Sequence, residues 1–429
     1  MSILILIMRI LFIAHRVPYP PNKGEKIRAL WQLRELSRNN KVDLFCFCDD
    51  PEDKKHAPRL QEYCDRLYVE DLPFLSSRVR ALQALLTGKP FSVEFFRSPT
   101  MARQINTALH SNSYDRIFVY SSSMAQYVQS ARGLSRILDL VDIDSDKWRQ
   151  YAEKSAWPLS WLWRREAQRL GTYEGRLVKD FALTLVCTEA EANLLRPKSP
   201  AGNIEVLQNF LDVNYYDPRS FVPPEAIRKL QPYVVFSGSM DYRPNVDAAV
   251  FFCKEVFPFI RKMMPNLRVV IAGRNPHSAV TDLQSDSAIH VTGNVADMRP
   301  YIWGASAAVV PMRIARGVQN KILEALASGT PVVSTSMASH ALPSGARSLL
   351  RVADTPPAIA EAIVDLINKT TNKTSQALRT AFRLYVESLD LNSKLQRIVA
   401  DPIASSTAAE CVAEESDLRT VCVTSNENS

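Results

Sequence analysis

The chain has 429 residues, of which 46% are hydrophobic and 23% are charged, a composition typical of a globular protein with two or three domains. The net charge is +7, but residues 401–429 carry −5, so the first 400 residues carry +12. A basic body suits an anionic partner such as a nucleotide or an anionic membrane surface. Because the basic residues are dispersed and no nucleic-acid-binding motif is present, we expect no nucleic-acid partner. Seven scattered cysteines without a Cys-x-x-Cys pair predict reduced thiols and a cytosolic compartment.

The N-terminus begins with an apolar run that ends at Arg9. The run lacks a positive leader, so we interpret its continuation, Ile10–Ala14, as a buried first strand rather than part of a signal peptide. Met8 is a candidate for the true start, because Met-Arg-Ile-Leu-Phe-Ile-Ala is a common opening for such a strand. No segment reaches the roughly 18 apolar residues needed to span a bilayer.

Short apolar strands alternate with helical stretches through the first half of the chain. A helix is predicted at 25–38, with apolar Ile27, Leu30, Trp31 and Leu33 at helical spacing. The predicted strands are 10–14, 42–46, 116–120, 137–141, 183–187 and 204–207. This alternation predicts a parallel sheet with helices on both faces.

The same pattern restarts in the second half, with a predicted helix at 246–264. The predicted strands are 232–238, 267–273, 289–293, 307–310 and 331–334. Two sheets in series predict an α/β protein with two doubly wound domains. We expect the domains to be 1–208 and 209–375, with helices in 376–400 packing back on the first domain and a disordered acidic tail at 401–429.

One loop and the helix after it carry most of the functional information. Between the strands at 307–310 and 331–334, a helix is predicted to begin near Gln319 and to end at Gly329. A loop that opens onto a helix N-terminus directs free N–H groups at an anion. Lys321 and Glu324 lie three residues apart and share a helix face, so one can meet a phosphate and the other a pair of hydroxyls. The other candidate binding residues in this stretch are Arg313, Arg316, Gly317 and Gln319.

This stretch resembles the donor-site signature of family 4 glycosyltransferases, in which a Glu, seven residues and a second Glu precede Ala-x-Ala-x-Gly-x-Pro-Val-Val. The second Glu holds the ribose of a sugar nucleotide and corresponds to Glu324. The first, which faces the donor sugar, falls on Arg316, so this chain departs from the pattern. The resemblance covers roughly 8–400. It implies the GT-B architecture, two Rossmann-like parallel-sheet domains facing across a cleft, with the acceptor in the first domain, the sugar nucleotide in the second, and neither metal nor cofactor.

The loop after the first strand holds a second group of candidates. In the family, a glycine-rich loop at this place lies over the donor diphosphate and sugar, and Gly24 matches it. Lys26 and Arg28 would add positive charge, and His15 lies at the strand end, where a catalytic or binding residue is expected. The alternative interpretation is a surface loop with a capping glycine and a structural histidine.

The loop after the first strand of the second domain departs from the family pattern. It begins at Gly238, and the family's two diphosphate-binding basic residues fall on Ser239 and Pro244. We therefore expect Arg243, or else Arg313 or Lys321, to take over this contact, since arginine suits phosphate well. The alternative for Arg243 is a solvent-exposed side chain without a ligand.

Asp142, Asp144 and Asp146 follow the strand at 137–141. We interpret Asp142 as a catalytic residue on the acceptor side, and Asp144 or Asp146 as a helix cap. An Asp-x-Asp spacing also marks the metal-dependent glycosyltransferase architecture, but the restarted sheet argues against that fold.

Residues 146–176 contain four tryptophans interleaved with arginines. This combination favours the boundary between acyl chains and headgroups of a membrane. The alternative is a helix pair with its tryptophans in the core. The tryptophans are Trp148, Trp157, Trp161 and Trp163.

A finer resemblance is to the bacterial sugar transferases of exopolysaccharide and exosortase systems, and it is carried by 141–148, 238–245 and 319–324. It implies transfer of a hexosyl unit, with retention, from a sugar nucleotide to a lipid-linked saccharide at the cytoplasmic membrane face. Two alternatives remain open: a sugar-nucleotide epimerase, and a non-catalytic subunit that binds nucleotide sugar and scaffolds an assembly.

Overall fold

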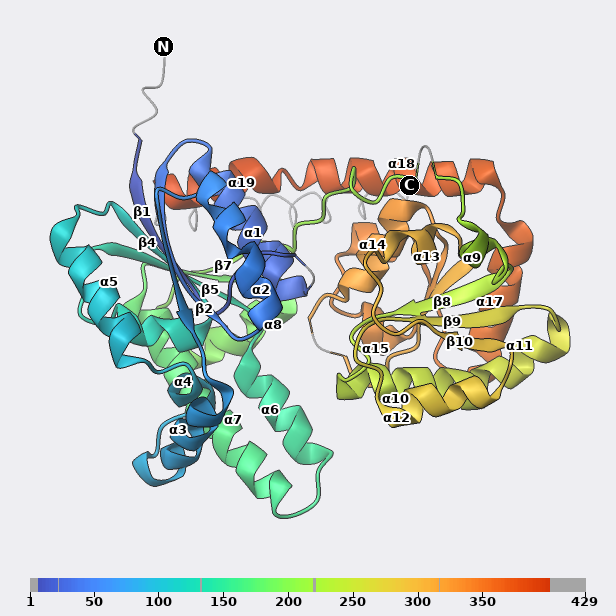
Figure 1. Cartoon of the computed structure of the whole chain (residues 1–429), viewed down its shortest axis with the longest axis horizontal. Coiled ribbons are helices and arrows are strands. Elements are labelled where there is room, and N and C mark those ends of the chain that lie inside the picture. The colour runs from blue at the N-terminus through green and yellow to red at the C-terminus, as the bar shows by residue number, and fades with distance from the viewer. Residues whose placement is uncertain (1–6, 22, 132, 219–220, 316, 402–429) are drawn as a thin grey trace, which may run out of the picture. The chain divides into compact units, whose positions relative to one another are not determined.

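The computed structural model describes residues 7–401, except 22, 132, 219–220 and 316 (Figure 1). The chain divides into two compact units. The first runs to Phe210 and resumes at Leu391, and the second is Leu211–Asp390. The segment expected to return to the first domain, 376–400, is therefore divided between the units. The expected disordered tail lies outside the described residues, apart from Asp401.

Among its described residues, the first unit contains one sheet of seven strands, all parallel. Their order is β3 (Arg66–Asp71), β2 (Lys41–Cys48), β1 (Arg9–Ala14), β4 (Arg116–Tyr120), β5 (Ser135–Val141), β6 (Leu183–Val186) and β7 (Ile204–Val206). The strand order reverses at β1 and β4, so loops leaving the carboxyl ends of these strands diverge and leave room for a ligand.

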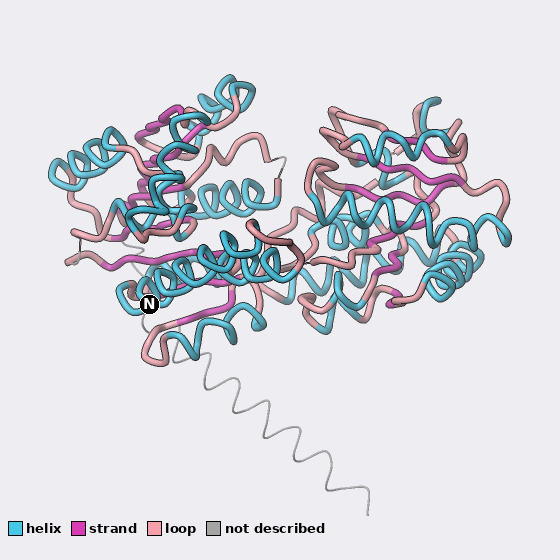
Figure 2. Tube along the Cα trace, turned by 90° about the horizontal axis from the view of Figure 1, so that it is seen from below, coloured by secondary structure: helices cyan, strands magenta, loops and turns pink. Residues whose placement is uncertain are grey.

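Helices flank the strands of this unit (Figures 1 and 2). They are α1 (Gly24–Ser37), α2 (Pro51–His56), α3 (Phe74–Thr87), α4 (Phe91–Phe95), α5 (Pro99–Ser111), α6 (Asp144–Glu153), α7 (Leu159–Asp180), α8 (Glu189–Leu195) and α19 (Leu391–Ala400). Successive residues of β1, from Ile10 to Ala14, are all buried, as expected for a strand covered on both faces.

The helix α19 packs against α1 and forms part of this unit, although it lies at the far end of the described chain. The Trp31 indole donates a hydrogen bond to Asn392 Oδ1 at 2.8 Å. The Arg116 guanidinium donates to the carbonyl oxygens of Val399 and Ala400 at 3.0 and 2.9 Å. The apolar face of α19, which includes Leu395, is buried.

The second unit repeats the architecture with six parallel strands in its described part. Their order is β10 (Ile289–Val291), β9 (Arg268–Ala272), β8 (Tyr233–Ser237), β11 (Ala307–Val310), β12 (Val332–Ser334) and β13 (Arg351–Val352). The helices are α9 (Glu225–Arg228), α10 (Arg243–Phe251), α11 (Phe257–Met263), α12 (Ser278–Thr281), α13 (Arg299–Trp303), α14 (Asn320–Ser328), α15 (Ser336–Ser339), α16 (Ser344–Arg347), α17 (Pro356–Lys369) and α18 (Asn372–Ser388). The predicted α/β fold with two doubly wound parallel sheets is confirmed.

The helix predicted at 246–264 is interrupted in the structure. It is observed as α10, a π-helical segment Phe252–Val256, and α11. Pro258 lies in the first turn of α11 and has no N–H to continue the α-helical ladder, which explains the interruption. Within the residues that the structure describes, no helix is long and apolar enough to cross a membrane.

Candidate functional site

The carboxyl ends of β8 and β9 meet through two glycines. Gly238 and Gly273 have backbone φ angles of 153° and 159°, values that residues with a side chain rarely adopt. A Cβ atom on Gly273 would lie 1.6 Å from the carbonyl oxygen of Gly238. A Cβ atom on Gly238 would lie 3.2 Å from the amino group of Lys321. The two glycines therefore allow the loops to pack together and keep the space beside Lys321 clear.

The helix predicted between β11 and β12 is confirmed. α14 begins at Asn320 and is followed by Gly329 in the left-handed conformation, with φ of 74°. Its Ile322 and Leu326 are buried in the core of the second unit. Lys321 and Glu324 lie on the same side of the helix and are half-buried.

The amino group of Lys321 lies in a partly apolar setting. It donates a hydrogen bond to Asn245 Oδ1 at 2.6 Å and lies 4.6 Å from the centre of the Phe236 ring. Burial lowers the pKa of Lys321 to about 7, although the nearby Glu324 carboxylate acts in the opposite direction. Near neutral pH this side chain therefore exists in both charged and uncharged forms.

Asn245 fixes the direction of the Lys321 side chain. Its amide nitrogen donates to the carbonyl oxygen of Ser239 at 2.9 Å, so its oxygen faces Lys321. Asn245 is buried in the first turns of α10. Asn245 ends the segment 238–245 that carries the finer resemblance, but its role could not be predicted from the sequence, because its partner is 76 residues away.

Glu324 is held by a second residue that sequence reasoning missed. The Tyr216 hydroxyl donates a hydrogen bond to the Glu324 carboxylate. Burial raises the pKa of Glu324, while the Tyr216 hydrogen bond and the Lys321 charge oppose that rise. The site thus places an amino group and a carboxylate one helical turn apart, each with a polar partner.

The arginines expected near this site have different environments. Arg313 forms a two-point ion pair with Asp247, at 2.6 and 3.1 Å, and stacks on the Phe251 ring at 4.6 Å. This pairing holds Arg313 against α10, so its expected role as a diphosphate ligand is not supported by its contacts. Arg243 is exposed at the first position of α10.

The loop before α14 is described on both sides of Arg316, which itself lies outside the described residues. Gly317 has φ of 57°, a left-handed conformation in which the loop turns into the helix. Gln319 occupies the position before the first helical residue.

In the first unit, His15 follows β1 as predicted. Its ring stacks on Tyr120, with centroids 5.7 Å apart, and meets the edge of Phe96 at 5.6 Å. Burial, with the Arg16 charge as a second cause, lowers the pKa of His15 to about 4. Nδ1 of this neutral imidazole has no hydrogen-bond partner among the described residues. This nitrogen is buried, so His15 has an unsatisfied polar atom at the end of β1.

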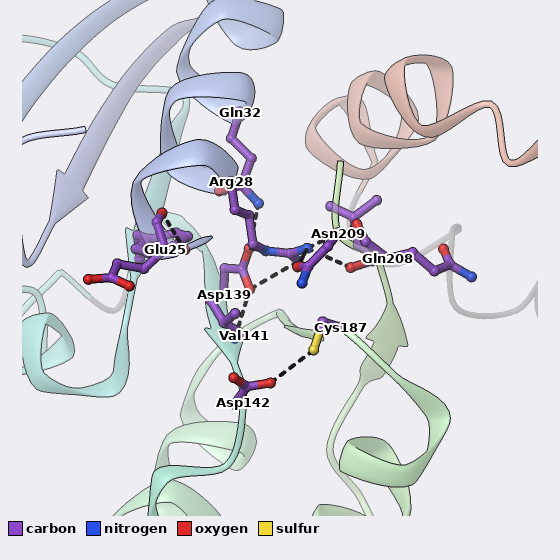
Figure 3. Close-up of polar contacts among 11 residues, drawn as sticks. Glu25, Arg28, Gln32, Asp139, Val141, Asp142, Cys187, Gln208 and Asn209 are labelled. Atoms are coloured by element: carbon purple, nitrogen blue, oxygen red, sulfur yellow. Dashed lines mark hydrogen bonds and ion pairs between the residues drawn. The ribbon is translucent and has the colours of Figure 1, made fainter. Parts of the chain in front are cut away.

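Asp142 follows β5, beside a strained residue. Val141 has φ of 66°, which is unfavourable for a β-branched side chain and redirects the chain at the strand end. The Cys187 thiol donates to Asp142 Oδ1 at 3.0 Å (Figure 3). Burial raises the pKa of the Asp142 carboxyl, and the negative charge of Asp144 contributes in the same direction.

The expected substrate-binding role of Arg28 is corrected by its surroundings (Figure 3). Its side chain is 1% exposed and forms two hydrogen bonds with Asp139, at 2.8 and 3.2 Å. It also donates to the carbonyl oxygens of Leu207 and Gln208, at 2.8 and 3.0 Å, and to Asn209 Oδ1 at 3.2 Å. Arg28 therefore ties α1 to β5 and to the segment after β7.

Lys26 needs the same correction. Its side chain is buried and pairs with Asp53, so it stabilises the packing of α1 against α2. Gly24 is the first residue of α1 and is exposed, so it leaves the start of this helix accessible.

The tryptophan-rich segment forms the helical pair α6 and α7 and the turn between them. Trp148 and Trp163 stack on each other with ring centroids 4.8 Å apart. Trp157 and Trp161 are 82% and 56% exposed. Two tryptophans therefore join the helices, and two face outward. No group of three potential metal ligands is found in the described ranges.

Comparison with known proteins agrees with this geometry. Residues 231–369 match the family model described as glycosyl transferases group 1. This range holds β8 to α17, including Lys321 and Glu324. No curated protein sequence matches the chain.

Solved structures share the two-unit fold. HepE from Anabaena, in complex with UDP and glucose, is 17% identical, with 93% of this chain and 100% of that chain covered and a TM-score of 0.61. Sucrose-phosphate synthase from Thermosynechococcus elongatus is 16% identical, with the same coverage and a TM-score of 0.66. A glycosyltransferase from Rickettsia africae is 13% identical, with 91% and 97% covered and a TM-score of 0.58. The fold is that of GT-B glycosyltransferases.

Proposed function

We propose that the protein is a glycosyltransferase that takes a sugar from a sugar nucleotide bound by its second unit. The observation that carries this proposal is the pair Lys321 and Glu324 on α14, inside the range that matches group 1 glycosyl transferases. HepE, which shares the fold, is described in complex with UDP and glucose. We infer that UDP is a suitable first nucleotide to test.

The chemistry of α14 suits the leaving diphosphate. The N-terminal end of the helix carries a partial positive charge, and Lys321 can supply a full positive charge beside it. When a diphosphate arrives, its negative charge favours the protonated form of Lys321. Stabilising charge on the leaving group is the main demand of glycosyl transfer, because the bond to the diphosphate oxygen breaks as the acceptor oxygen attacks.

Glu324 suits the ribose. An ionised carboxylate accepts hydrogen bonds only, and a ribose offers two neighbouring hydroxyl donors. Such charge-assisted contacts contribute about 1.5–3 kcal/mol. Resemblance to family 4 glycosyltransferases supports the same assignment, and it is also the support for hexosyl transfer with retention.

Replacing Glu324 by alanine tests the site. We expect about 10- to 100-fold weaker binding of UDP in a calorimetric titration, with the fold unchanged by circular dichroism. Glu361→Ala, on the exposed face of α17, is the matched control and should bind as the native protein does. A Glu324→Ala protein with native affinity would remove this residue from the site. UDP, GDP and ADP tested in parallel identify the preferred base.

Turnover separates transfer from the two alternatives. Consumption of a sugar nucleotide that requires an acceptor supports a transferase. Isomerisation of the sugar nucleotide without an acceptor supports an epimerase. Tight nucleotide binding without turnover of any donor supports a scaffold subunit.

For the first unit, we propose that it holds a lipid-linked saccharide acceptor, as in exopolysaccharide synthesis, at the cytoplasmic face of the membrane. Support comes from the start of α7, where Trp157, Leu159 and Trp161 are 82%, 52% and 56% exposed. Arg164 is exposed one turn further along. Exposed tryptophan and arginine together favour the interface of an anionic membrane, and the +12 charge of residues 1–400 adds attraction. Asp142 and His15 are proposed to contact the acceptor.

Vesicle co-sedimentation tests the membrane contact. We expect the native protein to bind phosphatidylglycerol vesicles, and a Trp157→Ala, Trp161→Ala variant to lose this binding while keeping its melting temperature. Phe259→Ala, which removes another exposed aromatic ring, is the control and should bind normally. Native vesicle binding by the double variant would contradict the proposal.

A further inference from the structure

The segment 214–217 is held in place from two sides. The Trp303 indole, at the end of α13, donates a hydrogen bond to the backbone oxygen of Tyr216 at 2.8 Å. From α18, Arg383 donates to Asn214 Oδ1 at 2.7 Å and to Asp217 Oδ2 at 3.2 Å. The backbone of Tyr216 and side chains before and after it are therefore anchored to helices of the second unit.

The neighbouring Tyr215 is fixed by Arg299. The guanidinium lies 3.9 Å from the centre of the Tyr215 ring and donates to the Tyr215 backbone oxygen at 3.2 Å. Asp297 holds Arg299 in turn, with a shortest contact of 2.6 Å. With Tyr215 occupied in this way, the segment presents the Tyr216 side chain to Glu324.

We propose that Tyr216 is a positioning residue of the donor site, whose hydroxyl holds the Glu324 carboxylate in the orientation that accepts the ribose hydroxyls. This inference rests on the proposed function of Glu324. A carboxylate has about four acceptor positions on its two oxygens, so one hydrogen bond from Tyr216 leaves the others for a ligand. The anchored backbone means that little conformational freedom is lost when the ligand binds.

The hydroxyl also affects the charge of Glu324. Burial disfavours the ionised form of this carboxyl, and the hydrogen bond from Tyr216 favours it. Without the hydroxyl, Glu324 would take up a proton at higher pH. Since only the ionised carboxylate can accept from both ribose hydroxyls, the loss of nucleotide affinity on acidification should then begin at higher pH.

Tyr216→Phe removes the hydroxyl and leaves the ring and the backbone oxygen that Trp303 binds. UDP titrated from pH 5 to 8 is the probe. We expect about tenfold weaker binding of UDP at neutral pH. We also expect the loss of affinity on acidification to begin at a higher pH than in the native protein. In turnover, KM should rise while kcat stays close to native, because the ribose contact is present in both the ground state and the transition state.

Tyr233→Phe is the matched control. The Tyr233 hydroxyl donates to the backbone oxygen of Tyr301 at 2.8 Å in the same unit, so this variant also loses one hydrogen bond. We expect it to keep the native affinity and pH profile. If the native protein binds UDP and both variants bind it equally well with the same pH profile, the positioning role of Tyr216 is overturned and the proposed function stands. If the native protein binds none of UDP, GDP and ADP, the proposed function fails, and this inference falls with it.

Discussion

Replacing Arg28 by methionine should destabilise the first unit strongly, because Arg28 neutralises a carboxylate that has no access to water. Asp139 is fully buried, and its other hydrogen-bond donors are the Gln32 amide and the Val141 N–H. Leaving a buried charge without its partner costs about 3–5 kcal/mol. For a unit of this size each kcal/mol lowers the melting temperature by about 2–4 °C, so the transition should fall by roughly 6–20 °C.

Differential scanning calorimetry with and without UDP measures this effect. A bound nucleotide should raise the transition of the second unit, so the two transitions can be told apart. Arg103→Met, an exposed arginine in the same unit, is the control and should change the melting temperature little. Adding Asp139→Leu to Arg28→Met should recover part of the loss, because the unpaired charge is then gone. An Arg28→Met protein that melts normally but binds UDP poorly would refute this reasoning and restore Arg28 as a ligand.

Two further predictions concern the second unit. The affinity for UDP should fall as the pH rises through about 7, because Lys321 then loses its charge. At pH 8, binding should take up a proton, and calorimetry in buffers of different ionisation enthalpy measures this uptake. Binding heats that are the same in every buffer would contradict it. Gly273→Ala should prevent normal packing of the β8 and β9 loops, because its Cβ would overlap the Gly238 carbonyl. Gly293→Ala, with φ of 65° and open space around it, should cost only about 1–2 kcal/mol. Equal urea midpoints for the two alanine variants would show that the close approach is not a constraint.

The fold could be predicted because buried parallel strands leave a strong local pattern. Each strand predicted from the sequence is present, and the helix from Asn320 to Ser328 begins and ends near the expected residues. The strands β3 and β13 were missed. β3 is only partly buried and mixes charged and apolar residues, and β13 has two residues. Neither carries an apolar run that a sequence pattern could reveal.

The candidate site could be predicted only where its geometry is local. Lys321 and Glu324 share a helix face because of their spacing, which the sequence shows directly. Tyr216 and Asn245 come from segments far along the chain, and no spacing rule connects them to α14. Lys26 and Arg28 were given a ligand-binding role because burial cannot be read from two basic residues near a loop. The carboxylate that pairs with Arg28 is 111 residues away.

The first unit is completed by α19, and this has a consequence for synthesis on the ribosome. After Phe210 has been made, the ribosome must add the whole of Leu211–Asp390 before α19 can emerge. At about 5–20 residues per second, this interval lasts roughly 10–40 s. Towards the end of that time the second unit has all of its strands and can fold, while the surface of α1 that receives α19 stays uncovered. The part of α1 that α19 covers therefore stays accessible to chaperones until almost the end of translation.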